Sequence, residues 1–253
     1  MENMQVIEYW RKKYLIEAVV VLVISMLIIG LFFLYVSHDF MVLLCFLTAV
    51  CDYLMIKELR ADLQTRGENL FLGRKTVDFE GLEFDFGRGI DEKQLLELEM
   101  IPAYQVRECG NVMKGNRFIM EEDWLYSVLS AKFLSFNQTS FQGVILRIEV
   151  PHSDTHGRGE IVQNESEIVI SGELSSALKK SGYEKVWTEL MDMFHADRIR
   201  VETAHGKMYF LIATKGHLFY QLSLLKPCQP QKFVERVQHC RQAAEQTASF
   251  LND

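Results

Sequence analysis

An uncharged apolar run near the N-terminus constrains the fold of this chain more than any other stretch. Residues 18–37 carry no charged side chain, residues 40–51 carry none either, and only His38 and Asp39 separate the two runs. About twenty consecutive apolar residues are enough for a helix to cross the hydrocarbon core of a bilayer. The sequence therefore predicts a transmembrane helical hairpin within residues 1–57, with a folded domain behind it.

The second apolar segment, residues 40–56, is shorter than the first and holds an acid, Asp52. At 1.5 Å per residue it reaches roughly 25 Å, which is short for a spanning helix unless the bilayer thins locally. An ionisable residue at membrane depth marks a functional position by default. Besides a role in transport or in a proton relay, two explanations stay open for Asp52. It pairs with a helix of another subunit, or it is satisfied by interfacial water or by a partner on the first helix.

Basic residues flank both open ends of the hairpin and are absent from its connection. They are Arg11, Lys12 and Lys13 before the first run and Lys57, Arg60 and Arg66 after the second. Because Lys and Arg collect on the cytosolic side of membrane proteins, the sequence predicts that both termini are cytosolic. Five cysteines without a CxxC pair also fit a reducing compartment better than a disulfide framework.

The charge balance bears on partners. The chain has 34 acidic and 27 basic residues, a net charge of −7. Proteins that bind nucleic acid need the opposite balance, so we predict no nucleic-acid partner. The predicted partners are the lipid bilayer and either another protein or a second copy of the chain. The sequence holds no GxxxxGK[ST], GxGxxG, GxSxG or HExxH motif, so we predict no catalytic residue and no cofactor.

Two further parts are predicted beyond the hairpin. Residues 58–90 are predicted to form a juxtamembrane helix and a connecting arm, with a strand or hairpin within 76–88. Residues 91–253 are predicted to form a cytosolic α+β domain. At its start, Asp91 can cap a short helix that runs to residue 101 and that Pro102 ends.

The middle of this domain is predicted as β structure. Apolar and polar residues alternate in three stretches, at residues 111–118, 124–136 and 140–150. A hairpin turn is predicted at residues 137–139. The acids Glu121, Glu122 and Asp123 are predicted to occupy a solvated turn between two strands, although such a cluster could also bind a cation or a basic partner.

The last third has the most regular pattern. The predicted elements are a strand at 167–170, a helix or turn at 174–180, an amphipathic helix at 183–194, β segments at 198–202, 207–213 and 217–224, and a helix from Pro230 to about Leu251. The predicted fold class is therefore α+β. It comprises a transmembrane hairpin, a mainly antiparallel β domain with flanking helices, and a C-terminal amphipathic helix. Strands closed by a final helix are also similar to pleckstrin-homology-like barrels.

One polar loop has the residue types of a metal site. Residues 152–160 are predicted to form a loop after Pro151, and they include His152, Asp154, His156 and Glu160. Imidazole and carboxylate groups at this spacing are weak candidates for divalent metal ligands. A solvated turn is the simpler interpretation, because metal sites normally rest on a supporting shell that a loop does not supply. The alternative function is a membrane-tethered metal-dependent hydrolase that uses this loop.

Order and pattern together also resemble a known family. The likeness is carried by the apolar pair, by the strands at 111–118 and 141–146, and by residues 183–194 followed by 207–213. In these features the chain resembles a bacterial membrane-protein family of unknown function with two N-terminal transmembrane helices and a cytosolic α+β domain. The resemblance implies the bacterial inner membrane and no reaction. The leading hypothesis is a membrane-anchored interaction or regulatory domain.

Overall fold

The structure is a computed structural model of the whole chain. It describes residues 2–33, 38–73, 81–86, 89–131, 134–150, 156–164, 167–214, 218–219 and 222–252. The chain divides into two compact units. The helical unit comprises Met1–Asp78 with Gln221–Lys232, and the sheet unit comprises Phe79–Tyr220 with Phe233–Asp253. We describe each unit by itself.

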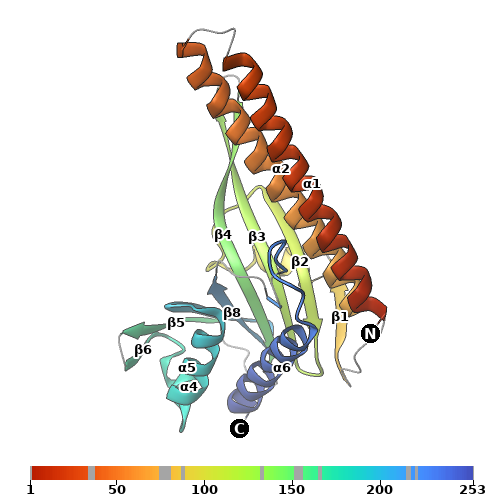
Figure 1. Cartoon of the computed structure of the whole chain (residues 1–253). Coiled ribbons are helices and arrows are strands. Elements are labelled where there is room, and N and C mark those ends of the chain that lie inside the picture. The colour runs from red at the N-terminus through yellow and green to blue at the C-terminus, as the bar shows by residue number, and fades with distance from the viewer. Residues whose placement is uncertain are drawn as a thin grey trace. The chain divides into compact units, whose positions relative to one another are not determined.

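The helical unit is built on two long helices, α1 (Glu2–Phe33) and α2 (His38–Gly73) (Figure 1). They pack antiparallel, because Ser25 meets Asp52 near the connection and Tyr14 meets Asp62 farther from it. Both are long and apolar enough to cross a membrane, over Gln5–Phe33 and Phe40–Leu70. Only 6% of the apolar window of each helix is buried within the protein. Such exposed apolar surface is what a lipid-facing helix presents.

The sheet unit contains one antiparallel sheet of eight strands among the described residues, in the order β1-β2-β3-β4-β8-β7-β5-β6. The strands are β1 (Glu83–Phe86), β2 (Val106–Lys114), β3 (Phe118–Ala131), β4 (Leu134–Glu149), β5 (Gly157–Asn164), β6 (Glu167–Gly172), β7 (Arg198–Ala204) and β8 (Lys207–Ala213). Its α-helices are α3 (Glu92–Leu96), α4 (Ser175–Leu178), α5 (Tyr183–Phe194) and most of α6 (Pro230–Asn252). The predicted α+β class is confirmed.

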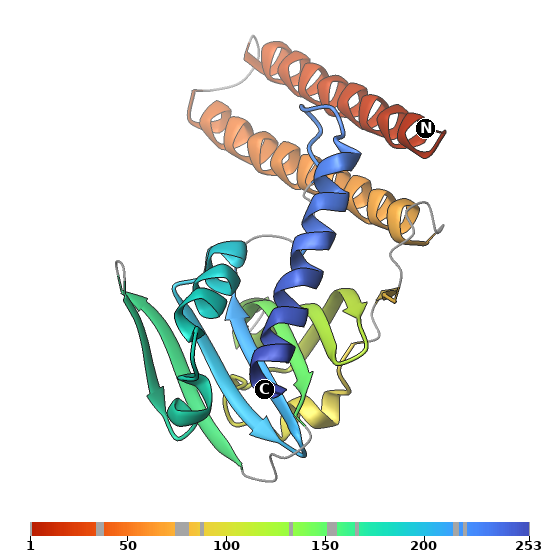
Figure 2. The same ribbon diagram turned by 90° about the horizontal axis from the view of Figure 1, so that it is seen from below.

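Helices α5 and α6 pack on one face of the sheet, as Figure 2 shows. Trp187 of α5 is fully buried, and its ring lies 5.6 Å from that of Phe210 on β8 and 5.3 Å from that of Phe250 on α6. The Trp187 indole N–H donates to the carbonyl oxygen of Leu178 at 3.0 Å, so its one polar group is satisfied. Phe233 and Val237 of α6 complete this core.

The other face of the sheet is covered by residues 90–104, which include α3. Asp91 caps α3 as predicted, and its carboxylate accepts the backbone N–H of Lys93 at 3.0 Å. The helix is shorter than predicted, ending at Leu96. The apolar cluster beneath it is formed by Ile90, Leu95, Leu98, Met100, Leu125, Phe141, Ile145, Ala204, Tyr209 and Leu211. This face also holds the buried carboxylates described below.

Several predicted turns are strand instead. Residues 137–139 lie within β4, where they pair with Tyr126, Ser127 and Val128 of β3. Residues 121–123 lie in the middle of β3. The predicted 152–160 loop gives way to β5 at Gly157, while residues 151–155 lie outside the described residues. These errors share one cause, because polar residues continue a strand when a neighbouring strand pairs with their backbone. Residues 121–123 have paired strands on both sides, and residues 137–139 have β3 on one side.

Other predictions have mixed outcomes. Helix α5, strands β6, β7 and β8, and helix α6 confirm the elements predicted for the last third. The described residues of the 217–224 segment form no strand, which corrects that prediction. The described sheet is open, with β1 and β6 at its two edges, so the similarity to a pleckstrin-homology-like barrel does not extend to closure.

Candidate functional site

The acid of the second apolar segment has a partner within the chain. The Ser25 hydroxyl of α1 donates to the Asp52 carboxylate of α2 at 2.7 Å, and Ser25 is buried in the helix pair. Of the two explanations left open for Asp52, the structure therefore provides the partner on the first helix. A serine on the facing helix is the kind of group that satisfies polar atoms between helices in a bilayer.

A short segment of the chain is bound to the helix pair at the polar end of α1. We call residues 222–229, which precede α6, the strap. The Arg11 guanidinium donates to the Leu224 carbonyl oxygen at 2.8 Å, and the Leu222 N–H donates to the Gln64 side chain at 2.6 Å. The Cys228 N–H donates to the Glu8 carboxylate at 3.4 Å. Three polar contacts from both helices thus hold an otherwise irregular segment.

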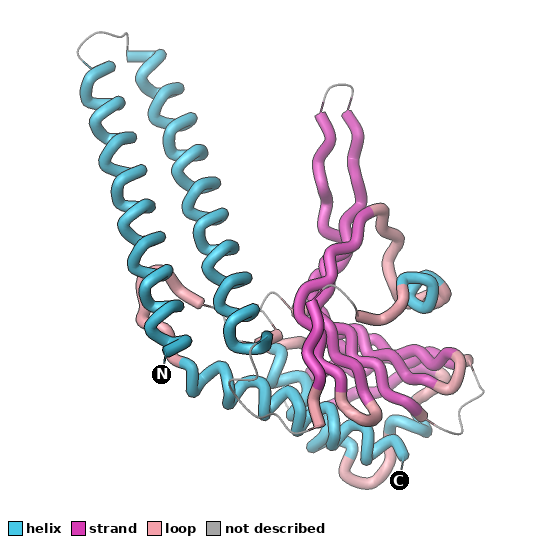
Figure 3. Tube along the Cα trace, turned by 90° about the vertical axis from the view of Figure 1, so that its right-hand side faces the viewer, coloured by secondary structure: helices cyan, strands magenta, loops and turns pink. Residues whose placement is uncertain are grey.

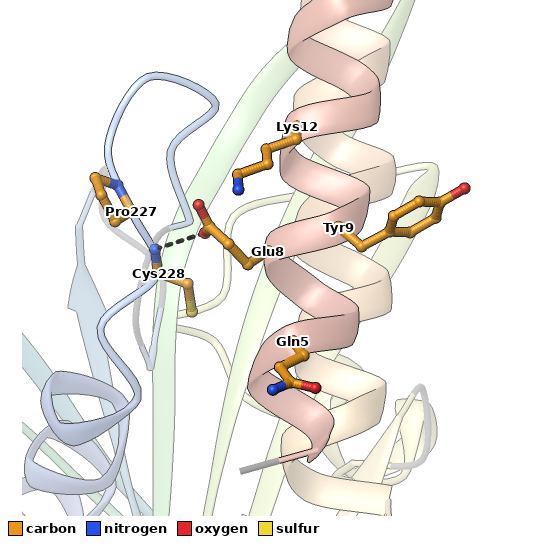
Figure 4. Close-up of a pocket in the computed structure, with 6 residues that line it drawn as sticks. All are labelled: Gln5, Glu8, Tyr9, Lys12, Pro227 and Cys228. Atoms are coloured by element: carbon orange, nitrogen blue, oxygen red, sulfur yellow. Dashed lines mark hydrogen bonds between the residues drawn. The ribbon is translucent and has the colours of Figure 1, made fainter.

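The strap and α1 enclose a groove of about 540 Å³. It is lined by Gln5, Glu8, Tyr9, Lys12, Pro227 and Cys228, and Figure 4 shows Glu8 reaching the strap with Lys12 beside it. Volumes of this size suit a small molecule or a few side chains of a partner. The α1 residues of the groove precede the uncharged run that begins at residue 18, and a spanning helix needs only about twenty apolar residues. The groove therefore belongs to the polar end of the helix pair.

Neither the Glu8 carboxylate nor the Cys228 thiol of the groove is available as a reactive group. Glu8 and Arg11 form an ion pair within one turn of α1, so the carboxylate carries a matched charge. Burial, and then the nearby charge of Glu8, raise the pKa of the Cys228 thiol to about 11. The thiol is therefore protonated at neutral pH and is not a nucleophile. Among the described residues that line the groove, none is an activated nucleophile.

A second polar cluster is buried in the sheet unit. Glu121 and Asp123 on β3 and Arg107 on β2 share one face of the sheet, and both carboxylates have 0% side-chain exposure. The Arg107 guanidinium donates to Glu121 at 2.9 Å and to Asp123 at 3.0 and 3.1 Å. It also donates to the Ile90 carbonyl oxygen at 2.9 Å, and the Ile90 N–H donates to Glu121. One arginine therefore serves two buried acids and one covering segment.

The charges of this cluster do not balance unless one acid holds a proton. Burial, and then the charge of Asp123, raise the pKa of Glu121 well above that of a free glutamic acid. Burial alone would lower the pKa of Arg107, but the hydrogen bond to Asp123 and the two carboxylates outweigh it and raise that pKa. The arrangement is therefore one guanidinium cation shared by two buried carboxyl groups, and the raised pKa of Glu121 favours a proton on that residue.

The surroundings of Glu121 leave no space for a ligand. A Cβ atom at Gly89 would lie 1.5 Å from the nearer Glu121 oxygen and 3.1 Å from the Cys109 sulfur. Burial is the main cause that raises the pKa of the Cys109 thiol to about 12, so this thiol too stays protonated. A closed cluster of this kind fastens the segment at Ile90 to the sheet.

A third buried acid fastens the same segment farther along. Glu202 on β7 is 4% exposed, and its carboxylate accepts the N–H groups of Glu99 at 3.1 Å and Met100 at 2.8 Å. These N–H groups lie beyond the C-terminal end of α3, and Glu202 is the acceptor that satisfies them. Buried carboxylates thus hold residues 90–104 on the sheet at two points. The buried acids Glu121, Asp123 and Glu202 stabilise the fold, and none of the three is accessible to a substrate.

The predicted metal loop is described only in part. His152 and Asp154 lie outside the described residues. The rings of His156 and His205 lie 5.9 Å apart, and Glu160 of β5 forms an ion pair with Arg198 of β7 at 3.3 Å. Among the described residues, no three His, Cys, Asp or Glu side chains are grouped to hold a metal ion. The metal-dependent hydrolase stays a prediction that no observation favours.

Sequence reasoning missed the groove and misplaced the acids. The groove is formed by residues about 220 positions apart, and local pattern carries no signal for such a contact. The run of three consecutive acids is visible in the sequence, and its charge predicts a solvated turn where the structure has a strand. The alternating apolar residues on either side, Ile119 and Leu125, are the signal that could have placed Glu121 and Asp123 on one strand face.

Comparison of the chain with protein-family models, with curated proteins and with solved structures finds no match. The resemblance to a two-helix bacterial membrane family therefore stays a prediction.

Proposed function

We propose that this protein is a membrane-anchored interaction or regulatory protein, with the α1–α2 pair as its anchor and the groove beneath the strap as its binding site. The strap carries the proposal, because its two ends continue into the sheet unit, at β8 on one side and at α6 on the other. The strap is continuous along the chain with both elements, so a partner that binds the strap can influence them. The absence of an activated nucleophile in the groove supports binding over catalysis.

The proposed orientation places both termini in the cytosol of a bacterial cell, at the inner membrane. It is supported by the six basic residues that flank the two apolar segments within α1 and α2, and by the lack of Lys and Arg between residues 37 and 39. Thiols at five positions also suit a reducing compartment.

Reporter fusions test this orientation. Alkaline phosphatase fused after residue 39 is expected to be active, because that enzyme needs the oxidising periplasm for its disulfides. The same reporter at the C-terminus is expected to be inactive, and a fluorescent protein there is expected to fold. An active phosphatase at the C-terminus would place the sheet unit in the periplasm and overturn the assignment.

Lys12 provides the test of the groove. Lys12 lines the groove, and its neighbour Lys13 faces Glu17 at 3.8 Å and is not among the lining residues. We expect Lys12→Glu to reduce recovery of a bound protein several-fold, because it places a second acid beside Glu8 in the groove. The measurement is quantitative co-purification of the full-length protein, tagged and extracted in mild detergent.

Lys13→Glu is the matched control, since it makes the same charge change one residue away and alters the flanking charge equally. A partner that binds through the groove is lost with Lys12→Glu and kept with Lys13→Glu. Equal recovery with both variants, or no protein enriched over an unrelated membrane protein, would show that the groove is not a protein-binding site.

A further inference from the structure

Strand β6 forms one of the two edges of the described sheet. It pairs with β5 on one side, from Asn164↔Glu167 to Gly159↔Gly172, and no described strand pairs with its other side. Figure 1 shows β6 beyond β5 at the end of the sheet, and Figure 3 shows in magenta how the strands of the sheet lie side by side. An edge strand presents a row of backbone N–H and C=O groups with no strand opposite them.

The backbone groups that face outward from β6 belong to Ile168 and Ile170. On β5, the Gln163 N–H donates to the Asp197 carbonyl oxygen at 3.0 Å, so it points toward β7. Because the backbone groups of successive residues point to opposite sides of a strand, the even-numbered residues of β5 face β6. Their partners on β6 are the odd-numbered residues, which leaves Ile168 and Ile170 facing outward. Among the described residues, none forms a hydrogen bond with these outward groups.

The two edges of the described sheet differ in their protection. Natural edge strands are commonly short and carry charges that prevent association with another strand. Strand β1 fits this pattern, because its 4 residues include Glu83 and Asp85. Strand β6 has 6 residues, without Lys, Arg or Pro, and its one charge is at Glu167. Its Val169 side chain is 41% exposed. Strand β6 is therefore able to accept another strand.

The sequence of β6 is complementary to itself when two copies run antiparallel with Val169 on a two-fold axis. Ile168 of each copy then lies opposite Ile170 of the other, and each such pair exchanges both of its N–H···O bonds. The two Val169 side chains meet in a pair without hydrogen bonds, where the Cα atoms are about 4.5 Å apart. Glu167 lies opposite Ser171, so like charges do not meet. The exposed valine is thus covered by its own copy.

Other registers of the same pairing are less favourable. A two-fold axis on Ile170 keeps the outward groups opposite one another, but it places Glu167 of each copy opposite the exposed Glu173 of the other. Like charges directly opposite each other destabilise a strand pair. An axis on Ile168 places Ile170 opposite a position that precedes β6, so the paired segment is shorter. The residues of β6 therefore favour the axis at Val169.

We propose that β6 pairs with β6 of a second copy of this chain, so that the two sheets join into one across a two-fold axis at Val169. The same surface is used by both copies, as in most homodimers. The proposed anchor confines both copies to one membrane, which raises their effective concentration, so a small interface suffices. The groove belongs to the helical unit and β6 to the sheet unit, so the dimer does not depend on the groove.

Disulfide crosslinking of the full-length protein in its membrane tests the register. Val169→Cys brings two new thiols together at the axis, where the Cα separation lies in the range of about 4.4 to 6.8 Å that a disulfide needs. In the matched control, Ser171→Cys, the new thiols are offset by roughly 13 Å along the paired strands. We expect mild oxidation to give a covalent dimer with Val169→Cys at several-fold the yield of the control. The wild-type protein, with its five native cysteines, sets the background. Coexpression of Glu167→Cys with Ser171→Cys is expected to restore the dimer, because these positions lie opposite each other.

Charge substitutions test the interface without a new bond. Val169→Lys places two like charges opposite each other at the axis, whereas Ser171→Lys places the same charge opposite Glu167 of the second copy. The measurement is energy transfer between full-length copies that carry donor or acceptor dyes at the C-terminus, reconstituted together in phosphatidylcholine vesicles. We expect Val169→Lys to abolish the transfer seen with the wild-type protein and Ser171→Lys to keep it. Both positions are exposed, and tryptophan fluorescence checks that both variants are folded.

Four outcomes would overturn the proposal. They are no energy transfer with the wild-type protein, transfer that survives Val169→Lys, equal crosslinking by Val169→Cys and Ser171→Cys, and crosslinking of Val169→Cys to a different protein in place of a second copy.

Discussion

Arg107→Met is expected to destabilise the sheet unit by about 3–5 kcal/mol, the cost of breaking a buried ion pair by removing one partner. The substitution leaves Glu121 and Asp123 buried together without a cation, and it removes the donor that holds the Ile90 carbonyl oxygen. Residues 90–104 are expected to loosen first, because the cluster fastens them to the sheet. The measurement is denaturant unfolding of the full-length protein in detergent, followed by tryptophan fluorescence.

Two further variants show whether the buried charge is the cause. Arg158→Met removes an arginine whose pairing with Glu99 is exposed, so it is expected to cost less than about 1 kcal/mol. Combining Arg107→Met with Glu121→Leu and Asp123→Leu removes the uncompensated charge, and is expected to recover most of the lost stability. Equal effects of Arg107→Met and Arg158→Met would show that the cluster contributes little.

Elements with a strong local signal were predictable from the sequence. The hydrophobic length of α1 and α2, the Asp91 cap of α3 and the periodicity of α5 and α6 each depend on neighbouring residues only. The turns between β strands were less predictable from the sequence. Residues 137–139 have turn-forming side chains, yet they continue β4 because β3 supplies backbone partners across from them. Whether such residues form a turn or a strand is decided by pairing partners that are distant in the sequence.

Most of the contacts at the candidate sites could not be predicted from the local sequence pattern. Glu8 and Cys228 meet only because the strap returns to α1, and Glu202 meets the N–H groups of Glu99 and Met100 from about a hundred residues away. Asp52 was identified as an exceptional residue from the sequence, but its partner Ser25 required the register of the two helices. Unusual residue types were visible in the sequence, and their environments were not.

The acidic run on β3 shows how residue type, which the sequence gives, combines with strand geometry, which the structure gives. A solvated turn would leave Glu121 and Asp123 ionised, each hydrated on its own. Strand geometry instead puts both on one buried face with Arg107, and Glu122 on the opposite face beside Asn111, whose amide donates to it at 3.2 Å. One cation cannot neutralise two acids, so the proton on Glu121 becomes part of the folded structure. That proton makes stability depend on pH.

The expected result is a loss of stability as pH rises above about 4.3, the ordinary pKa of glutamic acid. Below that pH the Glu121 carboxyl is protonated in both the folded and the unfolded protein, so it adds no pH dependence to the stability. Above it the unfolded chain releases the proton, while the raised pKa keeps it bound in the folded state. The unfolded state then binds fewer protons, and stability falls by up to about 1.4 kcal/mol per pH unit until the folded state also ionises.

Glu121→Gln isolates this contribution, because the amide keeps the shape of the protonated acid and cannot ionise. The amide has one acceptor oxygen, whereas the Glu121 carboxyl accepts from both Arg107 and the Ile90 N–H, so the variant is expected to be less stable by an amount that does not change with pH. We expect it to lose the downward slope between about pH 5 and 7, so its stability relative to the wild-type protein rises with pH. Unfolding midpoints of both full-length proteins, measured across this pH range in the same detergent, provide the comparison. Parallel pH profiles would show that Glu121 titrates alike in the folded and unfolded states, and that Arg107 balances both carboxylates without a bound proton.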